Sequence, residues 1–496
     1  MTHELVSATL PVWSIIPFAG MLLSIAIVPL VRPEWWEKHM LGVAFAWSLL
    51  FLIPFAVAYG IGESWFRLLE SVLLDYIPFI VLLLGLFVVA GGIAVRGTLA
   101  GTTKVNCLLL FIGTALASWI GTTGAAMLLI RPMIRANAWR KNKVHLMVFF
   151  IFLVANMGGC LTPLGDPPLF MGFQRGVPFT WTFHLLPILL LNLVIMFAIF
   201  AVMDKHFYNK EIKEGRSPHD AMAAGSKEPI RLEGAHNLIF IAMIIIGVLA
   251  NGLLPEMHPF FANGAGIHIY DEIVFPYATL AEIIIILAAA FFSIKTTKKS
   301  TRDLNEFTYA PIIEVAKLFI GIFVTMIPAL ILLKAHGAEL GMNDPWQMFW
   351  ATGALSSFLD NTPTYLVFLQ TAGALGATEG IVTSVGTVSQ IMLEAISAGA
   401  VFMGANTYIG NAPNFMVKSI AEEIRLKCRA SLATWAGPLP SSFRYSSSTP
   451  SYSSYKKRKY KKAGLLLQSC FLHLLNPVNG LADKQKAPHD VRRLFW

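Results

Sequence analysis

Long apolar stretches separated by short polar ones dominate the chain. Eight of them are long enough to cross a bilayer as helices, because a hydrocarbon core about 30 Å thick requires roughly 20 apolar residues. They lie at 10–31, 40–59, 71–93, 144–160, 183–203, 236–254, 273–293 and 312–334. Two further stretches, 105–130 and 347–370, are interrupted by polar residues. The pattern predicts an all-α polytopic membrane protein.

Composition agrees with this class, since 55% of the residues are hydrophobic and only 14% are charged. The net charge of +9 does not indicate nucleic-acid binding, because the basic residues lie in short loops beside apolar stretches and in the C-terminal tail. The first stretch is longer than the apolar part of a signal peptide and lacks a basic segment before it, so we expect it to remain as a helix. We therefore expect a multi-pass protein of the plasma (inner) membrane whose main partner is the lipid bilayer.

Two segments of the chain recur at nearly the same spacing. Ala115–Leu129 reads ALASWIGTTGAAMLL, and Ala354–Phe368 reads ALSSFLDNTPTYLVF. Thr162–Phe170 reads TPLGDPPLF, and Thr407–Phe415 reads TYIGNAPNF. Shared Gly, Pro and Thr positions are not expected from hydrophobic background alone, so the matches indicate a duplicated unit.

Loop charge predicts that the two units are inverted, because short cytoplasmic loops are enriched in Lys and Arg. The first match is followed by a loop containing Arg131, Arg135, Arg140, Lys141 and Lys143. The loop 371–380 after the second match contains no Lys or Arg. The assignment requires 105–130 and 347–370 to be re-entrant hairpins, the first opening to the cytoplasm and the second to the outside.

These boundaries divide the chain into six parts. They are N-terminal transmembrane helices (1–70), a first transporter repeat (71–203), a cytoplasmic loop (204–235), connecting helices and a loop (236–311), a second transporter repeat (312–427) and a basic low-complexity tail (428–496).

The repeated motifs place helix-breaking residues beside oxygen-bearing side chains at membrane depth. Such backbone must line a cavity or be buried in protein, and broken helices expose amides to anions and carbonyls to cations. Asp166 and Asp360 carry most weight, because an ionisable group inside a membrane is costly and usually functional. The candidate ion- or substrate-binding residues are Thr122, Thr123, Thr162, Gly165, Asp166, Asp360, Asn361, Thr362, Asn406, Thr407, Gly410 and Asn411. No catalytic constellation or cofactor motif accompanies them, so we do not expect an enzyme.

The segments 354–364 and 404–415 resemble the ion transporter superfamily, which includes NhaD-type sodium/proton antiporters, citrate and divalent-anion symporters and arsenite permeases. The resemblance covers most of residues 10–427 and implies inverted repeats, re-entrant hairpins, unwound helices and a homodimer that works by an elevator motion. The dicarboxylate symporters carry a Ser-Asn-Thr triplet at each hairpin tip. Here the matching positions are Gly121-Thr122-Thr123 and Asp360-Asn361-Thr362.

Asp360 makes the second tip more similar to the antiporters, and a fixed negative charge would oppose a polyanionic substrate. The sequence therefore favours sodium/proton antiport, in which Asp360 and Asp166, assisted by Asn361, bind transported Na⁺ or H⁺ in turn. Asp360 is expected to carry the transported charge. The alternative is a cation-coupled citrate or dicarboxylate transporter, in which the same oxygens bind Na⁺ and half-helix N-termini hold carboxylates.

The character of the chain changes abruptly after Lys427, where Ser-rich and Lys-rich runs begin. As written, this tail is basic and of low complexity. We hypothesise that it is an out-of-frame translation, because a shifted frame read from Lys427 can encode an apolar stretch resembling a final membrane helix.

Overall fold

The computed structural model of the chain describes residue 6 and residues 9–218, 229–262, 264–408 and 410–423. The predicted tail, 428–496, lies outside these residues. The helices are α2 (Ile16–Val31), α3 (Pro33–Tyr59), α4 (Ile61–Glu70), α5 (Ile77–Ala90), α6 (Thr103–Ile120), α7 (Thr122–Ala136), α8 (Val144–Leu153), α9 (Pro167–Gln174), α10 (Leu186–Lys213), α12 (Asn237–Met257), α13 (Tyr277–Thr296), α14 (Lys299–Leu304), α15 (Ala310–His336), α16 (Pro345–Phe358), α17 (Asn361–Ala374), α18 (Gln390–Met403) and α19 (Ala412–Glu423).

Short elements complete the architecture. A π-helical turn, Ser71–Tyr76, joins α4 to α5. The 3-10 turns are Val12–Ile15, Met157–Leu161, Phe179–Leu185, Pro259–Phe261, Gly337–Leu340 and Gly404–Asn406. The strands are β1 (Ala94–Arg96), β2 (Arg231–Glu233), β3 (Gly266–Tyr270), β4 (Ile273–Pro276), β5 (Ile381–Thr383) and β6 (Gly386–Val388). They form three separate antiparallel pairs, β1–β2, β3–β4 and β5–β6.

Nine helical stretches of the described chain are long and apolar enough to cross a membrane. Eight of them overlap the eight stretches predicted from the sequence, and the ninth is Thr103–Ile120, the first arm of the first predicted hairpin. The third stretch runs from Ile61 to Ala90, so the boundary expected after residue 70 falls inside a continuous helical segment. The chain is a multi-pass, all-α membrane protein.

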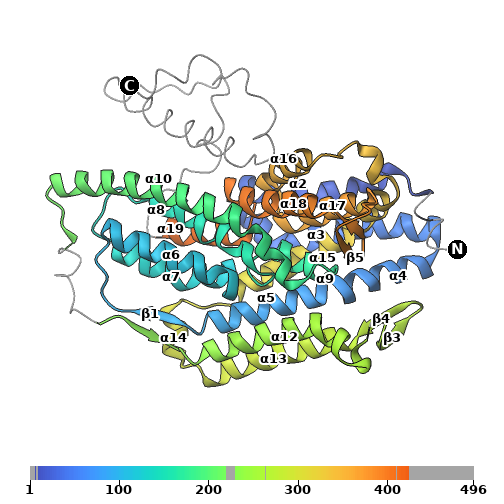
Figure 1. The fold of residues 1–496 in the computed structure, drawn as a ribbon, viewed down its shortest axis with the longest axis horizontal. Helices are drawn as coiled ribbons and strands as arrows, with labels where there is room; N and C mark the ends of the chain where they lie inside the picture. The colour runs from blue at the N-terminus through green and yellow to red at the C-terminus, as the bar shows by residue number, and fades with distance from the viewer. Residues whose placement is uncertain (1–5, 7–8, 219–228, 263, 409, 424–496) are drawn as a thin grey trace, which may run out of the picture.

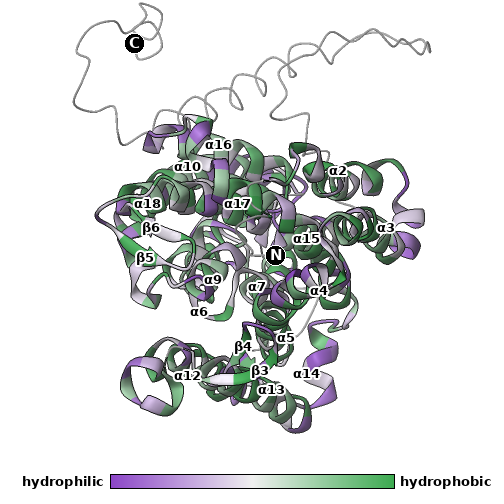
Figure 2. Ribbon diagram, turned by 90° about the vertical axis from the view of Figure 1, so that its right-hand side faces the viewer, coloured by the Kyte–Doolittle hydropathy of each residue, from purple (hydrophilic) through white to green (hydrophobic). Residues whose placement is uncertain are grey.

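Apolar side chains on the outside of the bundle are strongly exposed. Val57 of α3 is 84% exposed and Val202 of α10 is 73% exposed. Figure 2 shows that hydrophobic residues cover most of the helical ribbons and that hydrophilic ones gather mainly toward helix ends and connections. In a bilayer these exposed side chains contact lipid, which removes the penalty of leaving them in water.

Both predicted hairpins are present. The first consists of α6 and α7, which break at Gly121, a residue with φ of 77° that favours glycine. The second consists of α16 and α17, which break at Leu359 and Asp360. Two interrupted helices accompany them: the chain leaves helical geometry between α8 and α9, and again between α18 and α19.

The hydrogen bonds at the two breaks repeat the sequence duplication. Ser118 Oγ of α6 donates to the carbonyl of Gly158 at 2.5 Å. Ser357 Oγ of α16, at the equivalent position, donates to the carbonyl of Met403 at 3.1 Å. Equivalent residues therefore join each hairpin to its own interrupted helix, which confirms the two-repeat architecture.

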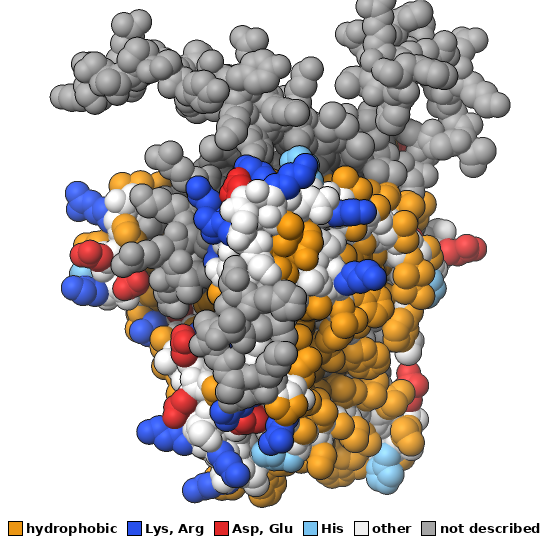
Figure 3. Space-filling model, turned by 90° about the vertical axis from the view of Figure 1, so that its left-hand side faces the viewer, with side chains coloured by type: hydrophobic (Ala, Val, Ile, Leu, Met, Phe, Trp, Pro, Cys, Tyr) orange, Lys and Arg blue, Asp and Glu red, His pale blue; other side chains and the backbone are white. Residues whose placement is uncertain are grey.

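The two repeats enter from opposite ends of the bundle. In Figure 1 the connection after α7 lies at the left end with α14 and β1, whereas β5 and the β3–β4 pair lie at the right end. Arg131 of α7 pairs with Glu306 at 2.7 Å, which places the C-terminal part of α7 beside the basic 294–309 segment. Figure 3 shows that Lys and Arg side chains are spread over this end. The fold is therefore two inverted repeats, as loop charge predicts.

One large apolar core connects both repeats. It includes Phe79 of α5, Phe150 of α8 and Phe323 of α15, all of them fully or almost fully buried. Dense packing of this kind holds the hairpins and interrupted helices at fixed positions, so polar groups at the helix breaks are placed against one another.

Candidate functional site

Asp166 lies where both hairpin tips meet both interrupted helices. It immediately precedes α9, and its side chain is buried, with 1% exposure. Asn361 Nδ2 donates to its Oδ2 at 2.8 Å, and Asn411 Nδ2 donates to its Oδ1 at 3.0 Å. The Thr122 hydroxyl lies 3.5 Å from Oδ1, at the long limit of a hydrogen bond. The carboxylate therefore collects donors from both repeats.

These residues form two pairs related by the repeat. Thr122 and Asn361 are equivalent, and each begins the second helix of its hairpin. Asp166 and Asn411 are also equivalent, and each precedes the second part of an interrupted helix. The duplication thus brings four matched positions into one cluster, in which a carboxylate of the first repeat faces an amide of the second.

Thr162 and Thr407 support the cluster through equivalent bonds. The Thr162 hydroxyl donates to the carbonyl of Ser118, and the Thr407 hydroxyl donates to the carbonyl of Ser357 at 2.5 Å. Both threonines therefore hold an interrupted helix against the last turn of a hairpin helix. This contact gives both threonines a positioning role, and the ligand role expected from the sequence stays a prediction.

Asp360 lies at the second hairpin tip and caps a helix. Its Oδ1 accepts a hydrogen bond from Thr362 N at 3.0 Å, which makes it the N-cap of α17. It is half-buried, whereas its neighbour Asn361 is fully buried and reaches Asp166. The deepest carboxylate of the candidate set is therefore Asp166.

Gly165 and Gly410 are required by close backbone approach. A Cβ atom on Gly165 would overlap the carbonyl of Gly159, and one on Gly410 would overlap the carbonyls of Ser356 and Gly404. Both glycines let the unwound segments fold tightly beside the hairpin tips. They shape the site through backbone packing.

The remaining candidates lie beside the cluster. Thr362 Oγ1 donates to Asn361 Oδ1 at 3.4 Å, and Thr123 is the half-buried second residue of α7. Asn406 Nδ2 donates to Ser357 Oγ at 2.8 Å. Asn406 Oδ1 is buried and has no hydrogen-bond partner among the described residues, so it is available as an oxygen ligand.

Two buried asparagines complete the cluster and were not predicted. Asn156 Nδ2 donates to Asn414 Oδ1 at 2.7 Å, and Asn411 Nδ2 lies 3.2 Å from Asn156 Oδ1. Asn414 Nδ2 donates in turn to the carbonyls of Gly404 and Thr407. In the sequence each of them is only an amide side chain within an otherwise apolar run. Such residues are also common where helices make purely structural contacts.

The surroundings of Asp166 are polar but lack a basic partner. Among the described residues Asp166 has no ion-pair partner, and the nearby carboxylate of Asp360 carries a charge of the same sign. Four helices, α7, α9, α17 and α19, begin within one or two residues of the cluster. Helix N-termini carry partial positive charge and favour anions.

Within the described chain no group of three or more His, Cys, Asp or Glu side chains could hold a metal ion.

The chain matches a known protein family. Residues 7–436 match the model of a family described as "Putative citrate transport". The chain belongs to this citrate-transport family. No curated protein sequence matches it. Membership makes the chain a secondary transporter, a class that the sequence predicts under both of its readings, and it favours the carboxylate reading over antiport.

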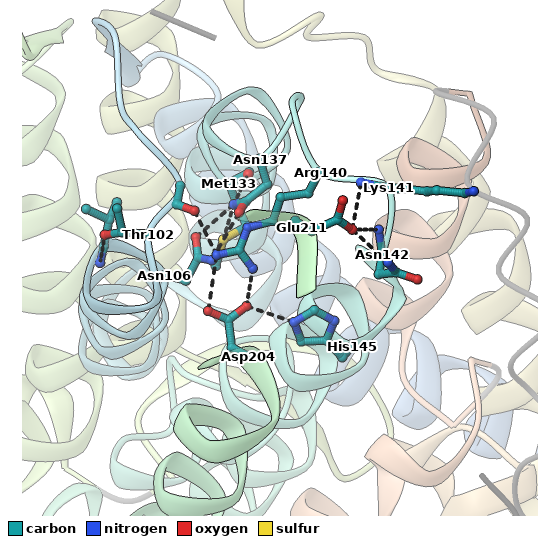
Figure 4. A network of polar contacts seen from close by, with 12 residues as sticks. Thr102, Asn106, Met133, Asn137, Arg140, Lys141, Asn142, His145, Asp204 and Glu211 are labelled. Atoms are coloured by element: carbon teal, nitrogen blue, oxygen red, sulfur yellow. Dashed lines mark hydrogen bonds and ion pairs between the residues drawn. The ribbon is translucent and has the colours of Figure 1, made fainter. Parts of the chain in front are cut away.

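A buried ionic network anchors the base of the first hairpin of this citrate-transport family protein (Figure 4). Arg140 Nη1 donates to Asp204 Oδ1 at 2.5 Å, and both side chains are completely buried. His145 Nε2 lies 2.8 Å from the same oxygen, and Arg140 Nη2 donates to the carbonyl of Gly101. Removing one partner of a buried pair leaves an uncompensated charge, so this network fixes the hairpin base to α10.

Proposed function

We propose that this protein is a cation-coupled transporter of citrate or a related dicarboxylate, and that Asp166 holds the coupling Na⁺ or H⁺. One observation carries the proposal: a buried carboxylate lies at the meeting point of four helix N-termini from two inverted repeats. Family membership supports the carboxylate substrate.

The helix N-termini provide the anion side of the proposal. α7 and α17 begin at the two hairpin tips, and α9 and α19 begin just after Asp166 and Asn411. Transporters with discontinuous helices direct such N-termini at the carboxylates of their substrates. Citrate and dicarboxylates carry two or more carboxylates and could engage N-termini from both repeats at once.

Asp166 provides the cation side. Its hydrogen-bond donors are neutral, so an ionised Asp166 has no positive partner from them and would attract Na⁺ or a proton. Na⁺ prefers oxygen ligands, and Asn406 Oδ1 and the unwound carbonyls are of that kind. The transported cation is a substrate here, so no resident cofactor is involved.

Coupling follows from charge. A free Asp166 carboxylate repels an anionic substrate near the same cluster, and two unit charges 4 Å apart interact by about 4 kcal/mol at an effective dielectric of 20. Cation binding removes this repulsion, so each ligand raises the affinity for the other. Cation and carboxylate would therefore cross the membrane together.

Sodium/proton antiport is the second candidate. The observation in its favour is Asp360, because it places a second carboxylate beside Asn361 and close to Asp166. Two neighbouring carboxylates could exchange Na⁺ for H⁺ by competition alone. In this reading the organic anion is unnecessary.

A flux experiment separates the two candidates. Purified protein in liposomes would be supplied with labelled citrate under an inward Na⁺ or H⁺ gradient, and internal pH would be followed with a trapped dye. Cation-dependent citrate accumulation is the expected result. Sodium-driven proton movement without organic anion, combined with no citrate uptake, would favour antiport.

A further inference from the structure

The short helix α9 connects the candidate site to a second polar region. Asp166 precedes its first residue, and Gln174 is its last residue. Eight residues of α-helix form a stiff rod about 12 Å long. A displacement of the Gln174 end is therefore transmitted to Asp166.

Arg175, which follows α9, is tied to elements on both sides. Its Nη2 lies 2.8 Å from Asp75 Oδ2, and the two side chains are only 21% and 13% exposed. Asp75 lies in the π-helical turn between α4 and α5, a type of turn that often marks functional sites. The carbonyl of Arg175 accepts from Ser384 N at 2.8 Å, in the connection between β5 and β6. Arg175 thus joins the second repeat's β5–β6 pair to the π-helical turn before α5.

Gln174 faces a second carboxylate across a helix interface. Glu282 of α13 is 1% exposed, and its Oε2 accepts from Asn251 Nδ2 at 2.6 Å. Its Oε1 and Gln174 Nε2 are both buried without a hydrogen-bond partner among the described residues, although the two side chains are close enough to interact. Because both groups are buried and neither has another partner among the described residues, their mutual attraction favours the present position of α9 against α13.

Apolar packing brings the same end of α9 against α12. The ring of Phe173 lies where a side chain on Gly252 would be, 3.1 Å from the position of a Cβ atom. Three consecutive residues at the end of α9, Phe173, Gln174 and Arg175, therefore contact α12, α13 and the π-helical turn that leads into α5, in that order. These three outer helices pack on one another (Figure 1).

We propose that Asp75 and Glu282 are positioning residues that latch the end of α9 to the outer helices, and so hold Asp166 in the conformation seen here. Both carboxylates lie outside the hairpins and interrupted helices, whereas their partners, Gln174 and Arg175, lie at the end of the helix that Asp166 precedes. Release of Arg175 from Asp75 would free α9 to move with the hairpins. The effect of the latch on transport rests on the proposed function of Asp166, but the contacts of Asp75 and Glu282 with the end of α9 do not.

Crosslinking tests the latch directly. Cysteines would replace Phe173 and Gly252 in a background lacking the native cysteines, and the rate of reaction with a short thiol crosslinker would report the latched state. Asp75→Asn should lower this rate roughly tenfold, in the range of coupling measured for interacting pairs. Reversing the pair, with Asp75→Arg and Arg175→Asp together, should restore it. Glu282→Gln provides a second, independent test of the other contact and should also lower the rate.

Glu70→Gln is the matched control, because Glu70 is a nearby carboxylate that pairs with Arg67 on its own helix. The control should crosslink at the parent rate. An unchanged rate in monodisperse Asp75→Asn protein would overturn the latch, as would a reduced rate that the reversed pair fails to restore. Asp166→Asn should leave crosslinking intact while it abolishes coupled transport, so failure of the latch and failure of the proposed function give different results.

Discussion

Asn411 donates a hydrogen bond of 3.0 Å to Asp166, and the two residues occupy equivalent positions in the two repeats. The duplication has therefore brought an aspartate and its asparagine counterpart into contact. Because the side chains have nearly the same shape, the cluster keeps its geometry while its charge lies on one repeat only. Because only one of the two equivalent residues is charged, we expect the cluster to bind a single coupling cation.

Exchanging the two residues tests whether the carboxylate or its place in the chain matters. Asp166→Asn alone should abolish cation-dependent transport, because it removes the charge that attracts the cation. Adding Asn411→Asp returns a carboxylate to the same hydrogen bond, so sodium-dependent citrate uptake should recover in part. Asn411→Asp alone adds a second carboxylate and should lower citrate affinity through repulsion. Equal loss in the single and double variants, with all proteins folded, would argue against this interpretation.

Thr162→Val removes the hydroxyl that joins an interrupted helix to the first hairpin. The carbonyl of Ser118 and the amide of Leu164 then lose a partner, so the protein should be destabilised by about 1–3 kcal/mol. Thermal unfolding in detergent would measure the change. Thr325→Val is the matched control, since this buried hydroxyl bonds only to carbonyls of its own helix, and its effect should be smaller. Equal destabilisation by both variants would remove the special role of Thr162.

Asp360→Asn separates the capping role of this residue from a role for its charge. Asparagine caps helices as well as aspartate does, so folding and expression should be retained. Under the carboxylate proposal, citrate uptake persists with a several-fold higher cation requirement, because only a neighbouring charge is lost. Complete loss of cation coupling in folded protein would instead assign the transported charge to Asp360, as the sequence first suggests.

Side-specific labelling tests the inverted topology. A cysteine at Arg135 should react only with reagent on the cytoplasmic side, and one at Ala377 only with reagent outside, because the C-terminal end of α7 and the connection between α17 and β5 lie at opposite ends of the bundle. Intact cells and inside-out vesicles would be compared with an impermeant thiol reagent. Labelling of both positions from one side would contradict the inverted repeats.

Much of the fold could be predicted from the sequence, because lipid imposes long apolar helices and the duplication preserved threonine, glycine and proline positions at the helix breaks. The positions of the hairpins follow from polar residues within apolar stretches, such as Thr122 and Asn361. That these two residues would reach one carboxylate could be expected only in part, since the repeat gives equivalence but no distance.

Other features could not be predicted, for physical reasons. Asp166 and Asp360 look alike in sequence, and only packing decides that one is buried under three donors while the other caps a helix. Asn156 and Asn414 resemble ordinary polar residues within helices. The contact between Asp75 and Arg175 joins residues far apart in the chain, and no local pattern reports such a pairing.

Cation-dependent uptake of labelled citrate by wild-type and Asp166→Asn protein in liposomes is the most direct measurement of the proposed mechanism. Wild-type protein should accumulate citrate against its gradient when Na⁺ or H⁺ is higher outside. If Na⁺ is the coupling ion, lowering the pH should raise the Na⁺ concentration required, because protons compete for the same carboxylate. Asp166→Asn protein should be folded yet unable to accumulate citrate at any cation gradient. Normal gradient-driven accumulation by this variant would show that Asp166 does not hold the coupling cation.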